Sequence, residues 1–220
     1  MKPIANNEQD LVFSYLTLRK AIGWLGISLP FTVSLGAFLF FQTKLQGSIS
    51  GYYHTGTRDV FVGTLWAIGF FLLSYKGYEP IDNLVGNLAC IFAVGITLFP
   101  TRPEINPAAG SKWISGLHFT FAALFFLTLI YFSLFLFTKT DPTKPPTERK
   151  LQRNKVYKTC GYVMAGCIAL IAIYSFLPES ITAPLKSVNL IFWLETIAVL
   201  AFGVSWLTKG EAILKDEVVN

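Results

Sequence analysis

The sequence predicts an all-α fold, a polytopic membrane protein built as a bundle of six transmembrane helices. Hydrophobic residues make up 53% of the 220 residues, and phenylalanine alone occurs 20 times. Charged residues make up only 14%, against roughly 25% in a typical soluble domain. A soluble chain of this length cannot bury so much apolar surface and still cover itself with polar groups. The composition therefore excludes a soluble enzyme, a disordered chain and a secreted module built on disulfides.

Long apolar stretches supply the predicted spans. A helix needs about 20 residues to cross the roughly 30 Å hydrocarbon layer. The six stretches comprise residues 21–42, 60–74, 84–99, 113–137, 160–177 and 188–207. Because the bilayer core offers the backbone no water, only helices or a closed barrel can span it. Barrel strands alternate apolar and polar residues in short segments, whereas these runs are continuous, which favours helices.

The N-terminal segment, residues 1–20, is predicted to be cytoplasmic or interfacial. Met1–Asp10 is polar and contains two acidic residues, which does not match the basic start of a signal peptide. The apolar residues that follow, up to Leu16, recur at helical spacing. They are consistent with a helix on the membrane surface or with an extension of the first span, and both interpretations stay open. Residues 21–207 form the predicted transmembrane domain, and residues 208–220 form a cytoplasmic tail.

The distribution of charge predicts the orientation. The chain carries 18 Lys and Arg against 13 Asp and Glu, a formal net charge of +5. Six spans put both termini on one side of the membrane, and 13 of the 18 basic residues fall on that side. Cytoplasmic loops are enriched in Lys and Arg, so both the N and C termini are expected to be cytoplasmic. We expect a multi-pass protein of the membrane, in a bacterium the inner (plasma) membrane, and nucleic acid is not needed to explain the basic excess.

Polar side chains gather in the outer half of the predicted bundle. Because buried polar groups are costly in a membrane, each of them is a functional candidate. Glu195 is the only carboxylate within a span, about 12 Å deep at 1.5 Å per residue. We expect a polar cleft that opens to the extracytoplasmic side and binds a lipid headgroup or a related ligand. The candidate ligand-binding residues are Ser50, Tyr53, His54, Arg58, Asp59, Arg102, His118 and Glu195.

The same residues allow a plainer interpretation, in which each polar group is satisfied on its own. Asp59 would stabilise the N-terminus of the second span. Arg58 and Arg102 would extend to lipid phosphates. His118 and Glu195 would form a structural hydrogen-bonded pair.

Two kinds of chemistry are also compatible with these side chains. The candidate catalytic residues are Ser50, His54, His118 and Glu195, with Ser50 and His54 as nucleophile and base. His54 and His118, with Asp59 or Glu195, could supply two histidines and a carboxylate to a metal ion. No spacing typical of a metal site requires this arrangement, and no metal or other cofactor is predicted.

Short motifs in the chain resemble those of the six-helix DRAM/Frag-like superfamily, and within it a bacterial membrane family. The shared motifs are the Ile49-Ser50 loop after the first span, the Arg58-Asp59 start of the second, the Phe99-Pro100 end of the third and His118 near the start of the fourth. The resemblance covers roughly residues 20–210. It implies a role with lipids, since eukaryotic members act in autophagy, in remodelling of GPI-anchor lipids and in lipid distribution. Glu195 matches no motif of the superfamily.

A fainter similarity links the Ser50-x-x-x-His54 pair to the alkaline-ceramidase-like hydrolases. Those proteins have seven spans and a late His-x-x-x-His motif. Here no histidine follows His118, so a zinc site of three histidines cannot be built in the same way.

Three functions therefore stay open. The first is a membrane protein that binds a lipid headgroup in its outer polar cleft. The second is a membrane-embedded lipid hydrolase that depends on a metal or on a serine and a histidine. The third is a small transporter or channel in which Glu195 and His118 relay protons. Membrane lipids are the expected partners, nucleic acid is not, and a homo-oligomer stays open.

Overall fold

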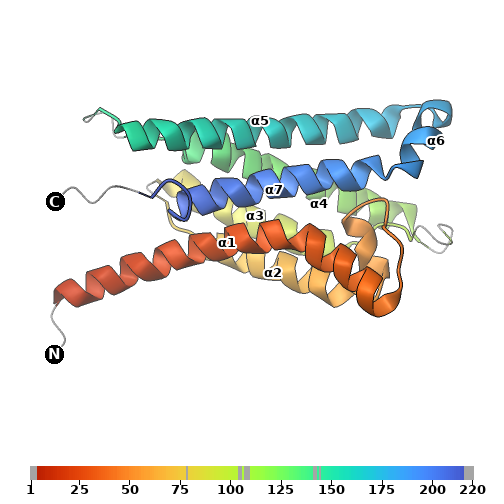
Figure 1. The fold of residues 1–220 in the computed structure, drawn as a ribbon, viewed down its shortest axis with the longest axis horizontal. Helices are drawn as coiled ribbons and strands as arrows, with labels where there is room; N and C mark the ends of the chain where they lie inside the picture. Colours follow the sequence, from red (N-terminus) through yellow and green to blue (C-terminus); the bar gives the residue numbers. More distant parts are fainter. Residues whose placement is uncertain are drawn as a thin grey trace.

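The computed structural model describes residues 4–77, 79–103, 106, 110–140, 143 and 145–215, with side chains from residue 15 onward. The described chain is helical and contains no strand, which confirms the predicted all-α class. The helices lie lengthwise in an elongated bundle (Figure 1). The described elements are α1 (Ile4–Phe41), the 3-10 helix η1 (Ser50–His54), α2 (Arg58–Ser74), α3 (Pro80–Leu98), α4 (Lys112–Tyr131), the π-helical turn η3 (Phe132–Leu136), α5 (Glu148–Phe176), α6 (Glu179–Ser187) and α7 (Leu190–Lys209).

Five helical segments are long and apolar enough to cross a membrane, which indicates a multi-pass membrane protein. They are Tyr15–Phe41, Pro80–Leu98, Lys112–Leu136, Glu148–Phe176 and Leu190–Lys209. α2, which contains the predicted span 60–74, has 17 residues, about 26 Å at 1.5 Å per residue. It is therefore slightly shorter than the roughly 30 Å hydrocarbon layer.

Two features of the helices differ from the expected spans. α1 runs without a break from Ile4 to Phe41, so residues 4–20 continue the first span as one helix. The residues 179–187, which lie between the expected spans, form the short helix α6.

The six long helices form a closed ring. Each packs against its neighbour in the chain, and α7 completes the ring by packing against both α5 and α1. The start of α1 and the end of α7 consequently lie at the same end of the bundle (Figure 1). We call this the terminal end (residues 15–20, 75–77, 79–82, 137–140 and 206–211), and the opposite end, which carries η1 and α6, the loop end (residues 43–57, 99–103 and 178–190).

Aromatic side chains fill the interior of the ring of helices near the terminal end. Trp206 is completely buried. Its ring centre lies 5.2 Å from that of Tyr75, 5.5 Å from Phe132 and 5.0 Å from Phe137, all in edge-on arrangements. Edge-to-face pairs at these distances are favourable beyond the area they bury. Some of the many aromatic side chains of the sequence therefore serve as core.

Small residues let α1 and α7 approach closely. A Cβ added at Gly203 would lie 2.7 Å from the carbonyl oxygen of Gly23 and 2.5 Å from a side-chain carbon of Ile27. Glycine at such crossings allows backbones to come together where the membrane supplies no hydrophobic force between helices. The closure of the ring therefore depends on the absence of a side chain at Gly203.

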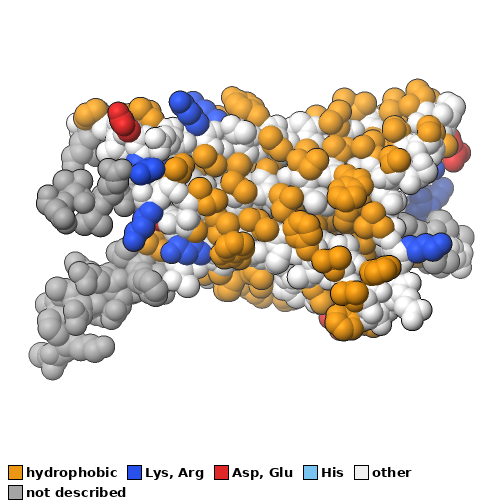
Figure 2. All heavy atoms as spheres, viewed as in Figure 1, with side chains coloured by type: hydrophobic (Ala, Val, Ile, Leu, Met, Phe, Trp, Pro, Cys, Tyr) orange, Lys and Arg blue, Asp and Glu red, His pale blue; other side chains and the backbone are white. Residues whose placement is uncertain are grey.

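The outer surface of the bundle is apolar along its middle. Figure 2 shows hydrophobic side chains over the central part of the molecule, with Lys and Arg side chains near its two ends. Large side chains that face outward in the middle of the helices include Leu35, Ile91 and Leu127, which are 56%, 57% and 55% exposed. Exposure on this scale is expected of a surface that faces lipid rather than water.

Candidate functional site

The loop between α1 and α2 folds back onto the loop end of α7. The N–H of Phe192 donates to the carbonyl oxygen of Gly47 at 2.8 Å. The N–H of Ile49 donates to Oε2 of Glu195 at 2.6 Å. Because Phe192 and Glu195 are three residues apart on one helix, they lie on one face of α7. α7 therefore holds the loop at two adjacent points, and the side chain of Glu195 provides one of them.

The residue that precedes α7 has a left-handed backbone conformation. Asn189, the residue before the helix, has φ 52° and ψ 46°. Asparagine adopts this conformation more readily than other residues with a side chain. The turn redirects the chain from α6 into α7, so that the first turns of α7 face the loop.

His118 caps the end of α3. Its Nδ1 lies 3.0 Å from the carbonyl oxygen of Ile96 and 2.8 Å from that of Phe99. Carbonyl oxygens only accept hydrogen bonds, so Nδ1 carries the proton and donates to both. The side chain is 2% exposed. His118 therefore satisfies carbonyls that the end of a helix leaves without a backbone partner.

His54 joins η1 to the segment that follows α3. Its Nε2 lies 2.6 Å from the carbonyl oxygen of Thr101. Nε2 must donate in this contact, for the same reason as in His118. The ring also packs edge-on against Tyr53, with centres 5.2 Å apart. His54 itself is exposed.

Two exposed arginines flank the contact between His54 and Thr101. Arg58 donates from Nη2 to the hydroxyl of Tyr53 at 2.7 Å, and its guanidinium carbon lies 4.4 Å from the centre of that ring. Arg102 is the neighbour of Thr101 in the chain. Its exposed side chain therefore starts from a backbone that His54 holds against η1.

The remaining candidates occupy less distinctive positions. Asp59 is exposed in the first turn of α2, where a negative charge is favoured by the helix dipole. Ser50 is half-buried at the start of η1. The Ser48 side chain, rather than that of Ser50, accepts the N–H of Gly51, at 3.0 Å.

The structure thus separates pairs that the sequence allowed to interact. Within the described residues, Ser50 and His54 form no hydrogen bond with each other, and His118 and Glu195 form none either. Each histidine donates to backbone carbonyls, and Glu195 accepts a backbone N–H. The part of the chain that the structure describes contains no group of three His, Cys, Asp or Glu side chains placed to hold a metal ion.

Charged side chains that the sequence reasoning overlooked gather at the terminal end. Asp82 is 2% exposed, and its Oδ2 accepts the N–H of Glu79 at 2.8 Å. Lys139 Nζ lies 3.0 Å from Glu79 Oε2 and 3.7 Å from Asp82 Oδ2. A signal was present, since an acidic residue before Pro80 and another three residues later are typical of a helix start. The apolar stretch that predicts the third span begins only at residue 84, so it leaves this first turn of α3 outside.

Arg19 belongs to the same end of the bundle. Its guanidinium carbon lies 4.4 Å from the centre of the Tyr15 ring and 5.5 Å from that of Tyr75. Tyr15 and Tyr75 are stacked with centres 6.0 Å apart. Arg19 also donates from Nη1 to the carbonyl oxygen of Lys209 at 3.5 Å. These contacts connect α1, the end of α2 and the end of α7.

Comparison of the chain with family models, with curated proteins and with solved structures finds no match. The function is therefore argued from the geometry of the chain itself.

Proposed function

We propose that the protein is a six-span membrane protein, with both ends in the cytoplasm, that binds a phosphate-bearing lipid headgroup at the loop end. The observation that carries the proposal is the 2.6 Å contact between His54 Nε2 and the carbonyl oxygen of Thr101. This contact joins the loop that leads into Arg58 to the segment that carries Arg102. Two exposed arginines, Arg58 four residues after His54 and Arg102 next to Thr101, therefore extend from backbone on either side of one fixed contact.

The chemistry of the two arginines suits a phosphate. A guanidinium presents several donors in a planar fork that matches phosphate oxygens. Arg58 is held by Tyr53 through a hydrogen bond and through its ring, so part of its conformational freedom is already lost before a ligand binds. An arginine ordered in this way binds at a smaller entropic cost. The resemblance of this region to a superfamily with lipid-related roles points in the same direction.

The contacts do not favour the hydrolase or the transporter. A histidine that acts as a base needs a nitrogen directed at its nucleophile, whereas within the described residues Ser50 forms no hydrogen bond with His54. A proton relay needs Glu195 and His118 in communication, whereas each is bonded to a different stretch of backbone. Glu195 and His118 act here as positioning groups, because each holds a stretch of backbone in place near the loop end.

Binding is tested with the purified protein in detergent, supplemented with phosphatidylglycerol or phosphatidylcholine. Phosphatidylglycerol is expected to raise the unfolding temperature of the wild type, and the double variant Arg58→Gln/Arg102→Gln is expected to lose most of that rise. The matched control is Lys44→Gln/Lys186→Gln, which removes two exposed cations from the same end. A folded arginine variant that keeps the full rise would overturn the proposal.

The topology is tested by cysteine labelling in intact cells. The three native cysteines are buried, so the background is low. An impermeant maleimide is expected to label Lys186→Cys in intact cells and Lys155→Cys only after the membrane is opened. The opposite pattern would reverse the orientation, and labelling of both in intact cells would contradict the single span that separates the two sites.

A further inference from the structure

The first turns of α5 turn one basic face into the bundle. Lys150, Arg153 and Tyr157 follow one another at intervals of three and four residues, which places them on one face of the helix. Lys150 donates from Nζ to the carbonyl oxygen of Phe137 at 2.8 Å, and Arg153 Nη1 lies 3.9 Å from Glu211 Oε1. Tyr157 is 2% exposed. These contacts hold the start of α5 against the terminal end of the bundle.

A second face of the same turns carries Lys155, Lys158 and Tyr162. The spacing is again three and four residues, and at 3.6 residues per turn this face lies about half a turn away from the first. Both lysines are exposed, and Tyr162 is 66% exposed. Because the lysines are one turn apart, their Cβ atoms lie about 5–6 Å from each other. Within the part of the chain that the structure describes, neither forms an ion pair with a carboxylate.

The two lysines lie where α5 enters its apolar stretch. Residues 159–176 of α5 carry no charge, and at 1.5 Å per residue they span about 27 Å, close to the roughly 30 Å hydrocarbon layer. Tyr162 lies one turn beyond Lys158, at the level where aromatic side chains prefer the membrane interface. Further along the helix, Leu170 and Ile173 are 53% and 57% exposed. The outward side of α5 therefore passes from cationic through aromatic to apolar.

We infer that this side of α5 binds an anionic phospholipid, whose phosphate contacts Lys155 and Lys158 and whose acyl chains follow the apolar part of the helix. The order of side chains along α5 matches the order of groups in such a lipid, from a negative head to an apolar tail. Each lysine near the surface contributes roughly fivefold to the preference for an anionic lipid, so two predict a preference on the order of 25-fold. The site lies at the opposite end of the molecule from the proposed arginine site and does not depend on it.

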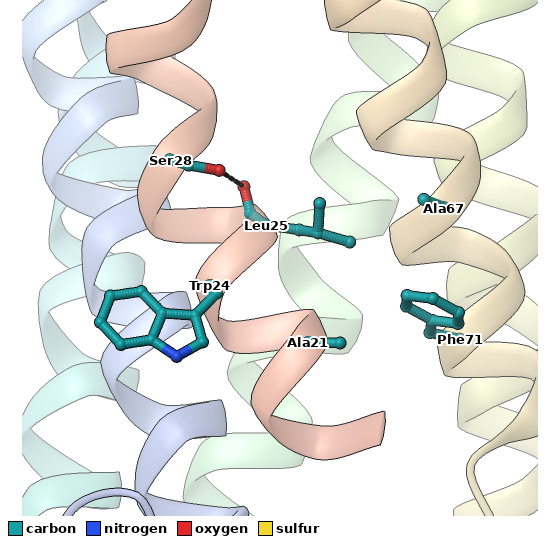
Figure 3. A pocket seen from close by; sticks show the side chains of 6 residues that line it. All are labelled: Ala21, Trp24, Leu25, Ser28, Ala67 and Phe71. Carbon is teal, nitrogen blue, oxygen red and sulfur yellow. Dashed lines mark hydrogen bonds between the residues drawn. The ribbon is translucent and has the colours of Figure 1, made fainter. Parts of the chain in front are cut away.

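An open groove between α1 and α2 lacks this polarity (Figure 3). It is lined by Ala21, Trp24, Leu25, Ser28, Ala67 and Phe71. None of these side chains is charged, so the groove lining does not select one headgroup over another. The lysine pair of α5, by contrast, distinguishes an anionic headgroup from a zwitterionic one.

Tyr162→Trp supplies a fluorescent probe at this site and keeps an aromatic ring at the position. The protein is reconstituted with phosphatidylglycerol or phosphatidylcholine whose acyl chains carry bromine, a quencher of tryptophan fluorescence. Subtracting the signal of the wild type, which has five tryptophans of its own, isolates the introduced tryptophan. Bulk lipid of either kind quenches alike, so a bound anionic lipid is detected as stronger quenching by brominated phosphatidylglycerol at the same mole fraction.

Three pairs of substitutions, each made together with Tyr162→Trp, decide the outcome. Lys155→Gln/Lys158→Gln is expected to abolish the excess quenching, whereas Lys155→Arg/Lys158→Arg keeps both charges and is expected to keep it. The matched control is Lys76→Gln/Lys215→Gln, which removes two exposed lysines outside α5 and is expected to leave the excess unchanged. All of these side chains are exposed or half-exposed to solvent or lipid, so the variants are expected to fold.

Equal quenching of Tyr162→Trp by the two lipids would overturn the inference, as would an excess that survives in Lys155→Gln/Lys158→Gln. An excess that the control Lys76→Gln/Lys215→Gln removes to the same extent would reflect the overall charge of the surface, and it would also overturn the inference. Arg58→Gln/Arg102→Gln is expected to keep the excess, because those residues lie near the loop end, so failure of the proposed function and failure of this inference are distinguishable.

Discussion

The carboxylate of Glu195 accepts the backbone N–H of Ile49 at 2.6 Å, across 146 positions of the chain. A carboxylate within an apolar span is costly unless it is paired or hydrogen-bonded. Here the partner is the first turn of η1, whose leading N–H groups have no partner within the helix. This contact therefore gives the acid of α7 a donor and fixes the loop that closes the end of the bundle.

Glu195→Ala is expected to lower the free energy of unfolding by about 1.5–3 kcal/mol, the range for a hydrogen bond to a charged group. Glu195→Gln is expected to lose less, because an amide oxygen still accepts the N–H of Ile49. Glu195→Lys places a cation in the span, which costs about 2.5–3.5 kcal/mol in the free energy of membrane insertion. This variant is therefore expected not to accumulate in the membrane. Unfolding in mixed micelles measures the first two, and equal stability of Glu195→Ala and wild type would show that the contact contributes nothing.

His118→Phe is expected to destabilise the protein by about 1–3 kcal/mol, because it leaves the buried carbonyl of Ile96 and the half-buried carbonyl of Phe99 without this donor. His54→Phe is the matched control, since it also removes a contact to a carbonyl but at an exposed position where water can replace the donor. Thermal unfolding of both variants in the same detergent makes the comparison. A larger loss for His54→Phe than for His118→Phe would contradict the capping role of His118.

Gly203→Ala is expected to destabilise the protein by about 1–3 kcal/mol, the usual range for overpacking. The added Cβ would meet the backbone oxygen of Gly23, which cannot move without shifting α1. Gly166→Ala is the control, because a Cβ there meets nothing within 4 Å and alanine favours a helix over glycine. If both variants unfold alike, the close approach of α1 and α7 is not what makes Gly203 necessary.

Ser133 and Ser205 bond to each other through their hydroxyls at 2.8 Å, and both are buried. Either single change to alanine is expected to cost about 1–3 kcal/mol, since the other hydroxyl loses its partner, whereas the double variant is expected to be nearly neutral. A double-mutant cycle on the free energy of unfolding measures this coupling. Additive losses would mean that the two hydroxyls do not depend on each other.

The sequence identified most of the helices because hydropathy is a local property. The expected start of the second span at residue 60 lies two residues from the start of α2 at Arg58, and the expected end of the third at residue 99 lies one residue from Leu98. The start of α3 was missed because the acidic residues around Pro80 were assigned to a loop, although they form the first turn of the helix. The length of α1 was left open because its first turns are polar and apolarity alone defines only the part that crosses lipid.

The candidate residues were found by type, but their partners were not. Glu195 and His118 were singled out because polar groups are rare in spans, a criterion that needs no structure. That Glu195 bonds Ile49 rather than His118 follows from the folding of the loop onto α7, which no spacing in the chain indicates.

The sequence by itself determined the membrane class and the approximate positions of the helices, because both depend on how residues near in the chain partition into lipid. Only the tertiary structure decided which helices adjoin and which carbonyl oxygens each histidine contacts. Those features depend on closure of the ring through Gly23 and Gly203, a contact between residues 180 positions apart whose energy arises only when the two helices meet.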